Sequence, residues 1–115
     1  MSASFKRVGR VLRLREGCEA EYDRLHTAVW PEVLASIQAA GIRNYSIFRH
    51  GQWLFSYFEL PVDRVTGGCT LTAEQSEICR RWEALMHELQ EPLPESADDN
   101  WWVPTNEVFH WDGDT

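Results

Sequence analysis

The sequence predicts an α+β fold, an antiparallel β-sheet with helices, built in the order β-α-β-β-α-β. The first observation is that apolar and polar residues alternate over 5–15, 42–50 and 52–60, which is the period of a strand. The second is that apolar residues recur every three or four positions within 18–40 and again after Thr72, which is the period of a helix.

The first strand is predicted over 5–15, because apolar side chains fall on one parity and arginines on the other. The apolar set is Val8, Leu12 and Leu14, and the arginine set is Arg7, Arg13 and Arg15. One face of this strand is therefore expected to be buried, and Gly17 is expected to end it.

A helix is predicted from about Cys18 to Ala40, with Pro31 inside its apolar pattern. Proline removes a backbone donor and clashes with the preceding turn, so we expect a kink or a helix restart at that position. Gly41 is expected to end the helix.

The segments 42–50 and 52–60 are predicted to pair as a hairpin that turns at 50–52. Aromatic residues gather on one face of the second strand, which suits packing against a helix layer or a partner sheet. They are Trp53, Phe55 and Tyr57. A loop is predicted over 61–71.

The second helix is predicted to begin at a capping box formed by Thr72 and Gln75 and to end at Pro92. An acidic loop is expected over 91–100, and a last strand over 105–111.

Right-handed crossovers turn this order into a ferredoxin-like arrangement, with both helices on one face of the sheet. The other face remains uncovered, on a chain that is rich in aromatic residues. We therefore expect a homodimer that buries it. The 115 residues suit one domain with one core, spanning 1–115.

The net charge of −7 excludes two classes of partner. There is no basic stripe for nucleic acid, and an anionic membrane surface would repel the chain. The four histidines are scattered with no metal-ligand spacing, and no phosphate loop occurs, so we expect no metal and no cofactor.

Cysteine usage points to the cytoplasm. Cys18, Cys69 and Cys79 are odd in number and form no closely spaced pair, which is typical of reduced thiols. The N-terminal residues contain no apolar signal core, and no segment approaches membrane-spanning length.

The strongest candidate for chemistry is the pair Tyr22 and His26, four residues apart on one helix face. Leu25 and Val29 share that face, so a phenol and an imidazole point toward apolar surroundings. Imidazole exchanges protons near neutrality, and a phenol donates or accepts hydrogen bonds. The alternative interpretation is that His26 is a hydrogen-bonded core residue.

Several stretches together resemble the L-rhamnose mutarotase family over nearly the whole chain. They are Glu21-Tyr22 through His26, Val29-Trp30-Pro31-Glu32, Gly41-Ile42-Arg43-Asn44-Tyr45-Ser46-Ile47, Cys79-Arg80-Arg81-Trp82 and Asn106-Glu107-Val108-Phe109-His110. The resemblance implies a dimeric α+β barrel of ferredoxin-like subunits. It also implies an isomerase that interconverts the α and β anomers of a free sugar without a cofactor.

By this resemblance His26 corresponds to the proton donor, and Tyr22, Tyr45 and Trp82 correspond to sugar-contacting positions. Tyr22 is also expected to polarise the anomeric hydroxyl or to orient His26, so both are catalytic candidates. The family often carries a second tryptophan after the first, where this chain has Glu83, which we include as a substrate-binding candidate. The alternative is that Tyr45 and Trp82 are core residues and Glu83 a solvated one.

Two other functions remain open from the sequence. One is a cofactor-independent monooxygenase on the same dimeric scaffold, because a fold does not determine a function. The other is a protein that binds a small ligand without catalysis, which would not need His26 to titrate.

Overall fold

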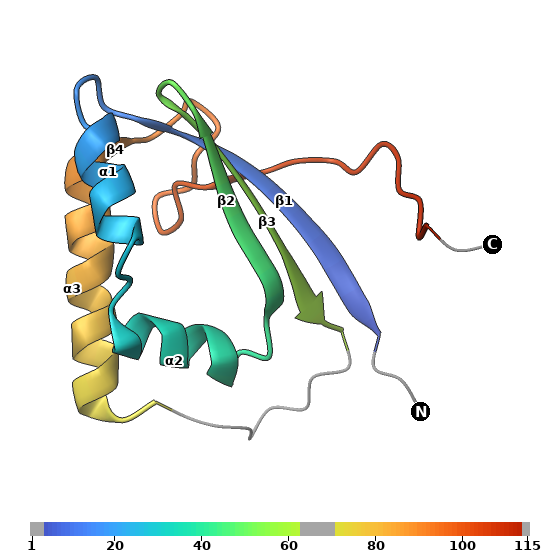
Figure 1. Ribbon diagram of the computed structural model, residues 1–115, viewed down its shortest axis with the longest axis horizontal. Helices are drawn as coiled ribbons and strands as arrows, with labels where there is room; N and C mark the ends of the chain where they lie inside the picture. Colours follow the sequence, from blue (N-terminus) through green and yellow to red (C-terminus); the bar gives the residue numbers. More distant parts are fainter. Residues whose placement is uncertain (1–3, 63–70, 114–115) are drawn as a thin grey trace.

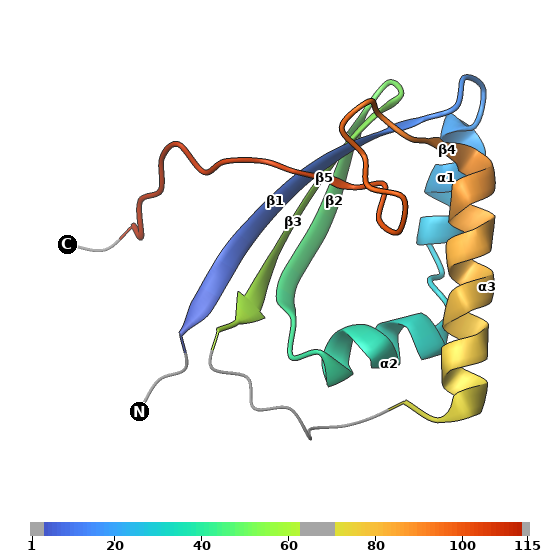
Figure 2. The same ribbon diagram turned by 180° about the vertical axis from the view of Figure 1, so that it is seen from behind.

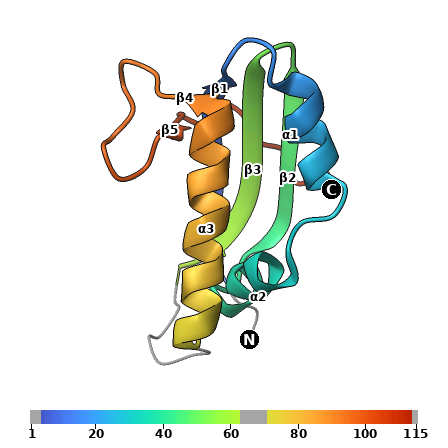
Figure 3. The ribbon, with the colours of Figure 1, turned by 90° about the vertical axis from the view of Figure 1, so that its left-hand side faces the viewer.

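The computed structural model describes residues 4–62 and 71–113 of the protein (Figure 1). The elements are β1 (Phe5–Leu14), α1 (Glu19–His26), α2 (Pro31–Ala39), β2 (Arg43–His50), β3 (Trp53–Pro61), α3 (Ala73–Leu89), β4 (Gln90–Glu91) and β5 (Val103–Pro104). The sheet has the order β2-β3-β1-β4, and β5 pairs with β1. All its pairings are antiparallel. The three helices lie on one side of this sheet (Figures 1 and 3), so the predicted ferredoxin-like α+β fold is confirmed.

The core forms where the inner face of the sheet meets α3. Leu12 and Leu14 of β1 and Leu54 of β3 are fully buried. Met86 and Leu89 of α3 complete the same cluster. The alternation that predicted one buried face of β1 is thus confirmed, since the apolar residues of one parity meet the helix layer.

The predicted helix over 18–40 is two helices, so the restart at Pro31 is confirmed. Trp30 has an extended backbone, and Pro31 is the first residue of α2. Proline disfavours the helical conformation in the residue before it and is itself well suited to a first helical position. As a result α1 and α2 point in different directions (Figure 3).

The hairpin of β2 and β3 forms as predicted, but its register is interrupted between Arg43 and Ser46. Asn44 adopts a left-handed backbone conformation there, with φ of 54°. Asparagine tolerates this conformation better than most residues, and such an irregularity bends a strand and re-aims its side chains. The residue that follows is Tyr45, one of the predicted site residues.

The capping box at the start of α3 is confirmed. The Thr72 hydroxyl accepts a hydrogen bond from the backbone N–H of Gln75 at 3.0 Å, and the Gln75 side chain accepts one from the Thr72 N–H at 2.9 Å. The predicted end at Pro92 is wrong, because α3 stops at Leu89. The next two residues form β4, which periodicity missed because two residues carry no period. Residues 63–70 of the predicted loop lie outside the described residues.

The predicted strand over 105–111 is also wrong. The last strand is only Val103–Pro104, and the following residues through 113 form no helix or strand. Proline has no N–H to donate to a ladder. The chain then crosses β1 at Gly9, where the Thr105 hydroxyl lies 3.0 Å from the place a Cβ would occupy. The segment beyond it extends away from the sheet (Figure 2).

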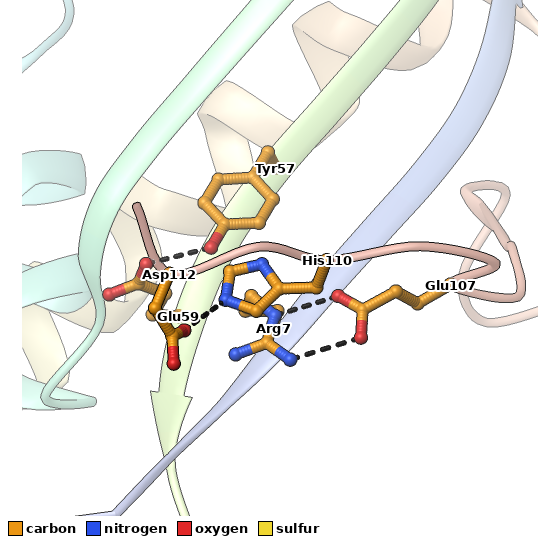
Figure 4. Close-up of polar contacts among 6 residues, drawn as sticks. All are labelled: Arg7, Tyr57, Glu59, Glu107, His110 and Asp112. Atoms are coloured by element: carbon orange, nitrogen blue, oxygen red, sulfur yellow. Dashed lines mark hydrogen bonds and ion pairs between the residues drawn. The ribbon is translucent and has the colours of Figure 1, made fainter. Parts of the chain in front are cut away.

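One ion pair joins the first part of this segment to the sheet face opposite the helices, which we call the outer face. The Arg7 guanidinium donates two hydrogen bonds to the Glu107 carboxylate, at 2.7 and 3.0 Å (Figure 4). Nearby on β3, the Tyr57 hydroxyl donates to the Glu59 carboxylate at 2.7 Å. Figure 4 also shows the contact between His110 and Asp112 within the segment itself.

The outer face and the C-terminal segment leave large apolar side chains in contact with solvent in the single chain. On the sheet these are Phe48, Trp53 and Phe55, and on the segment Val108, Phe109 and Trp111. Phe48 and Phe55 are directly paired across β2 and β3. An apolar surface of this kind is typical of an interface between subunits.

Candidate active site

A cavity of about 610 Å³ opens between the helices and the inner face of the sheet. Four of the five predicted site residues line it together: Tyr22 and His26 from α1, Tyr45 from β2 and Trp82 from α3. Most of its remaining walls are apolar, from α2 and β2. The cavity therefore combines a few polar groups with an apolar lining, as small-molecule sites usually do.

Among the residues that the structure describes, one hydrogen bond holds the ring of His26. Its Nδ1 lies 2.9 Å from the backbone carbonyl oxygen of Tyr22. A carbonyl oxygen only accepts, so Nδ1 carries the hydrogen and donates it. No described residue contacts the other ring nitrogen, Nε2, through a hydrogen bond. Nε2 is therefore the atom of His26 that is available to a ligand in the cavity.

Tyr22 is almost completely buried, with 3% of its surface exposed, and still lines the cavity. Its ring centroid lies 4.1 Å from that of His26, so the phenol ring limits the orientation of the imidazole. Burial raises the pKa of the Tyr22 phenol above its ordinary value, and a hydrogen bond with Gln90 opposes this only in part. Tyr22 therefore stays neutral and acts as a hydrogen-bond donor rather than a base.

Trp82 belongs both to the core and to the cavity wall. Its ring meets the His26 ring edge-on at 5.4 Å and the Trp30 ring edge-on at 5.1 Å. Only 7% of its surface is exposed. The core interpretation of this residue is thus compatible with its position in the cavity, because the indole belongs to the core cluster and also lines the open space.

Tyr45 lines the cavity from the sheet and lies within the irregular part of β2, between Arg43 and Ser46. Its ring packs 5.2 Å from that of Phe58, between centroids. Its hydroxyl oxygen accepts a hydrogen bond from Arg10 at 3.1 Å. Tyr45 also lines a second cavity, of about 500 Å³, so it stands between two neighbouring spaces.

Arg10 is the polar residue that the sequence reasoning missed. It shares the parity of Leu12 and Leu14, so it lies on the inner face of β1. Its guanidinium donates to Ser56 at 3.2 Å and lies over the rings of Phe58 and Trp102, 4.8 and 4.9 Å from their centroids. The sequence did contain a signal for it, because Arg10 occupies a position of the predicted strand at which the alternation expects a buried apolar residue.

Glu83 does not line the first cavity. It follows Trp82 on α3, and successive helical residues point about 100° apart. The carboxylate lines the second cavity instead, together with Arg10, Tyr45 and Gln90. The structure thus brings four predicted residues to one space and places the fifth at the adjoining one.

An ion pair between Asp23 and Arg49 joins α1 to β2, and both of these residues line the first cavity. The Arg49 guanidinium donates to both carboxylate oxygens of Asp23, at 2.8 and 2.7 Å. This hydrogen bond holds the pKa of Asp23 below its usual range. Asp23 is therefore a fixed anion at neutral pH and a poor proton acceptor.

Within residues 4–62 and 71–113, no group of three or more histidine, cysteine, aspartate or glutamate side chains is arranged to hold a metal ion. Across the same part of the chain, none of the helices is long and apolar enough to cross a membrane.

Comparison with known sequences identifies close relatives. The family model described as L-rhamnose mutarotase matches residues 7–111. The L-rhamnose mutarotase of Opitutus terrae is 36% identical over 89% of this chain and 94% of its own length. That of Lactiplantibacillus plantarum is 36% identical over 92% of this chain and 98% of its own length. The L-fucose mutarotase of Xanthomonas campestris is 34% identical over 92% of this chain and 88% of its own length.

Comparison with solved structures gives the same fold. The crystal structure of an L-rhamnose mutarotase from Formosa agariphila superposes with a TM-score of 0.70. The two chains are 23% identical, and the match covers 93% of this chain and 99% of the other. These comparisons give no support to a monooxygenase or a non-catalytic binding protein.

Proposed function

Because the chain belongs to the L-rhamnose mutarotase family, we propose that it is an isomerase that interconverts the α and β anomers of L-rhamnose or a related free monosaccharide. The relatives include mutarotases named for L-rhamnose and for L-fucose, which are both 6-deoxy-L-hexoses. The substrate class is therefore a neutral 6-deoxy sugar with a free anomeric hydroxyl. We further propose that residues 1–115 form one domain.

Mutarotation breaks the bond between C1 and the ring oxygen, rotates the aldehyde that results, and closes the ring on its other face. The ring oxygen must gain a proton as the anomeric hydroxyl loses one, and closure reverses both transfers. No electron is transferred and no covalent intermediate is needed. The chemistry thus requires one group that carries a proton and several that hold the sugar.

In this proposal His26 gives the proton from Nε2 to the ring oxygen as the bond from C1 to that oxygen breaks. Nε2 then takes the proton of the anomeric hydroxyl, directly or through water, which leaves the open-chain aldehyde and restores His26. Its Nδ1 is held by the Tyr22 carbonyl, which keeps Nε2 directed away from that bond. Tyr22, which is neutral, donates a hydrogen bond that polarises the anomeric oxygen. Tyr45 and Trp82 hold the ring, and Glu83 binds from the second cavity.

The observation that carries the proposal is the position of His26. A histidine with one ring nitrogen bound to a backbone carbonyl and the other unoccupied lines a cavity shared with Tyr22, Tyr45 and Trp82. A histidine that served only the core would leave no ring nitrogen toward an open space, because buried polar atoms are normally hydrogen-bonded.

The test is anomer exchange of free L-rhamnose and L-fucose, measured by saturation-transfer NMR with and without the protein. Exchange between the two C1 proton signals should accelerate in proportion to protein concentration. If the folded protein accelerates the exchange of neither L-rhamnose nor L-fucose, the proposed activity is refuted.

We propose in addition that the protein works as a homodimer joined through the outer face. The exposed pair Phe48 and Phe55 supports this, since a monomer would leave both side chains in water. A second copy of the same surface is the simplest partner, because most soluble oligomers are symmetric dimers.

We place the protein in the cytoplasm. Cys18 and Cys79 are free thiols in the structure, which suits a reducing compartment. Cell fractionation followed by immunoblotting tests this assignment, and recovery outside the cytoplasmic fraction would overturn it.

A further inference from the structure

The second cavity is lined by one arginine, Arg10, and two carboxylates, Glu83 and Asp99, and the arginine pairs with neither carboxylate. Arg10 and Glu83 both line it, and neither forms an ion pair with any residue of the described chain. The Arg10 guanidinium is bound instead by two neutral hydroxyl groups, those of Tyr45 and Ser56. Arginine has five N–H donors, so three remain for a ligand.

Aromatic rings hold the guanidinium in place. Phe58 and Trp102 each lie within 5 Å of it, measured from ring centroid to the central carbon. Stacked guanidinium groups keep their N–H edges free while their faces are covered. The remaining donors of Arg10 are therefore preorganised, although no described carboxylate uses them.

An unpaired arginine and an unpaired carboxylate in one cavity favour a ligand with hydroxyl groups. An anion would satisfy Arg10 but would be repelled by Glu83 and Asp99, which line the same cavity. A cation would satisfy the carboxylates but not Arg10. A sugar hydroxyl both donates and accepts, so adjacent hydroxyls can bond with the guanidinium and the carboxylate together.

A 6-deoxyhexose can be placed across the two cavities, which share Tyr45 as a lining residue. In a pyranose the ring oxygen lies between C1 and C5, and the hydroxyls on C2, C3 and C4 lie on the opposite edge. With the ring oxygen near His26, the C6 methyl next to it meets apolar side chains such as Val33 and Ile37. The hydroxyl edge then passes Tyr45, which lines both cavities, toward the second one.

We infer that the second cavity is the subsite for the C2–C4 hydroxyl edge of the sugar, and that Arg10 and Glu83 determine which 6-deoxyhexose is preferred. L-Rhamnose and L-fucose differ only in the configuration at C2 and C4, which are both on this edge. The inference rests on the proposed mutarotase function and adds its specificity-determining residues.

The variants Glu83→Gln and Arg10→Lys test this role. Glu83 is exposed on α3, so its replacement leaves the core intact. Arg10→Lys keeps the charge but loses the fork of donors. Matched controls are Glu88→Gln and Arg80→Lys on α3, since neither residue lines the first or the second cavity. Each protein is assayed with L-rhamnose, L-fucose and their analogues lacking the C2 or the C4 hydroxyl.

Glu83→Gln and Arg10→Lys should each raise KM for the preferred sugar by roughly 10- to 100-fold, the range for a hydrogen bond to a charged group, with kcat little changed. The ratio of kcat/KM between L-rhamnose and L-fucose should shift by a similar factor. The penalty should disappear for an analogue that lacks the contacted hydroxyl, whereas both controls should behave as the wild type.

An unchanged sugar ratio in both variants of an active protein would overturn the inference and leave the proposed function standing. A wild type that exchanges no sugar would refute the proposed function instead. Calorimetric titration with the same sugars measures whether Arg10 and Glu83 contribute to sugar affinity. Affinity lost in both variants would support it, and equal affinity, or no binding by the wild type, would overturn it.

Discussion

Replacing His26 with asparagine tests the roles of its two ring nitrogens separately. The asparagine amide reaches the position of Nδ1 and can still donate to the Tyr22 carbonyl, which the imidazole contacts at 2.9 Å. Nothing replaces Nε2, the ring nitrogen with no described hydrogen-bond partner in a residue that lines the cavity. The substitution therefore removes the proposed proton transfer and keeps the local hydrogen bond.

The expected effects on rate and on stability differ in size. Loss of a positioned general acid slows a reaction by roughly 10²- to 10⁴-fold, so anomer exchange should fall by at least about 10²-fold. The variant also loses the ring contacts of His26 with Tyr22 and Trp82. At about 0.5–1.5 kcal/mol for each aromatic pair, the free energy of unfolding should fall by about 1–3 kcal/mol.

The assay compares exchange rates of L-rhamnose per folded molecule, with the folded fraction measured by urea denaturation. His50→Asn is the matched control, because His50 is exposed at the end of β2 and lines neither of the two cavities described above. Sugar affinity should change much less than the rate, since Tyr45 and Trp82 still hold the ring. A folded His26→Asn protein that exchanges anomers at the wild-type rate would show that His26 is not the acid.

Trp82→Ala should lower the free energy of unfolding by about 3–5 kcal/mol and also weaken sugar binding, because Trp82 is 7% exposed and lines the cavity. Urea denaturation measures the stability and calorimetric titration measures the affinity. A loss of affinity with unchanged stability would contradict the place of Trp82 in the core. Light scattering at micromolar concentration should give about twice the chain mass of 13.4 kDa, and Phe55→Glu should shift the protein toward monomer; a wild-type mass of one chain would rule out the dimer. Hydrogen bonds from Tyr57, Arg43 and Asn44 lower the pKa of Glu59 to about 2, so its stabilising effect is complete above the pKa of an unfolded glutamate and is lost as pH falls through about 2. The difference in unfolding free energy between wild type and Glu59→Gln should accordingly shrink between about pH 4 and pH 2, and a difference independent of pH would contradict this assignment.

The kinds of element could be predicted because each depends on neighbours in the sequence. Alternation and helical spacing report burial on one face, which is a local property of a strand or a helix. The stops are local too: Gly41 adopts a positive φ of 76° after α2, and Pro31 restarts the helix. For the same reason Tyr22 and His26 could be paired from their spacing of four residues.

Elements shaped by distant contacts were not predictable from a pattern. The final strand is two residues long, because Pro104 interrupts the ladder and the chain crosses β1 beside Gly9 instead. The pairing of β4 with β1 depends on where α3 ends in space. Neither feature has a period, and the strand predicted over 105–111 was therefore wrong.

In the candidate site, too, some features follow from the sequence alone and others from the tertiary structure. The sequence by itself determined that His26 and Tyr22 share a helix face, because a helix repeats every 3.6 residues whatever surrounds it. Only the tertiary structure joined Arg10 to Tyr45, which are 35 positions apart, and placed Glu83 at a second cavity. Contacts between different elements depend on how the sheet and helices pack, and no local pattern records that packing.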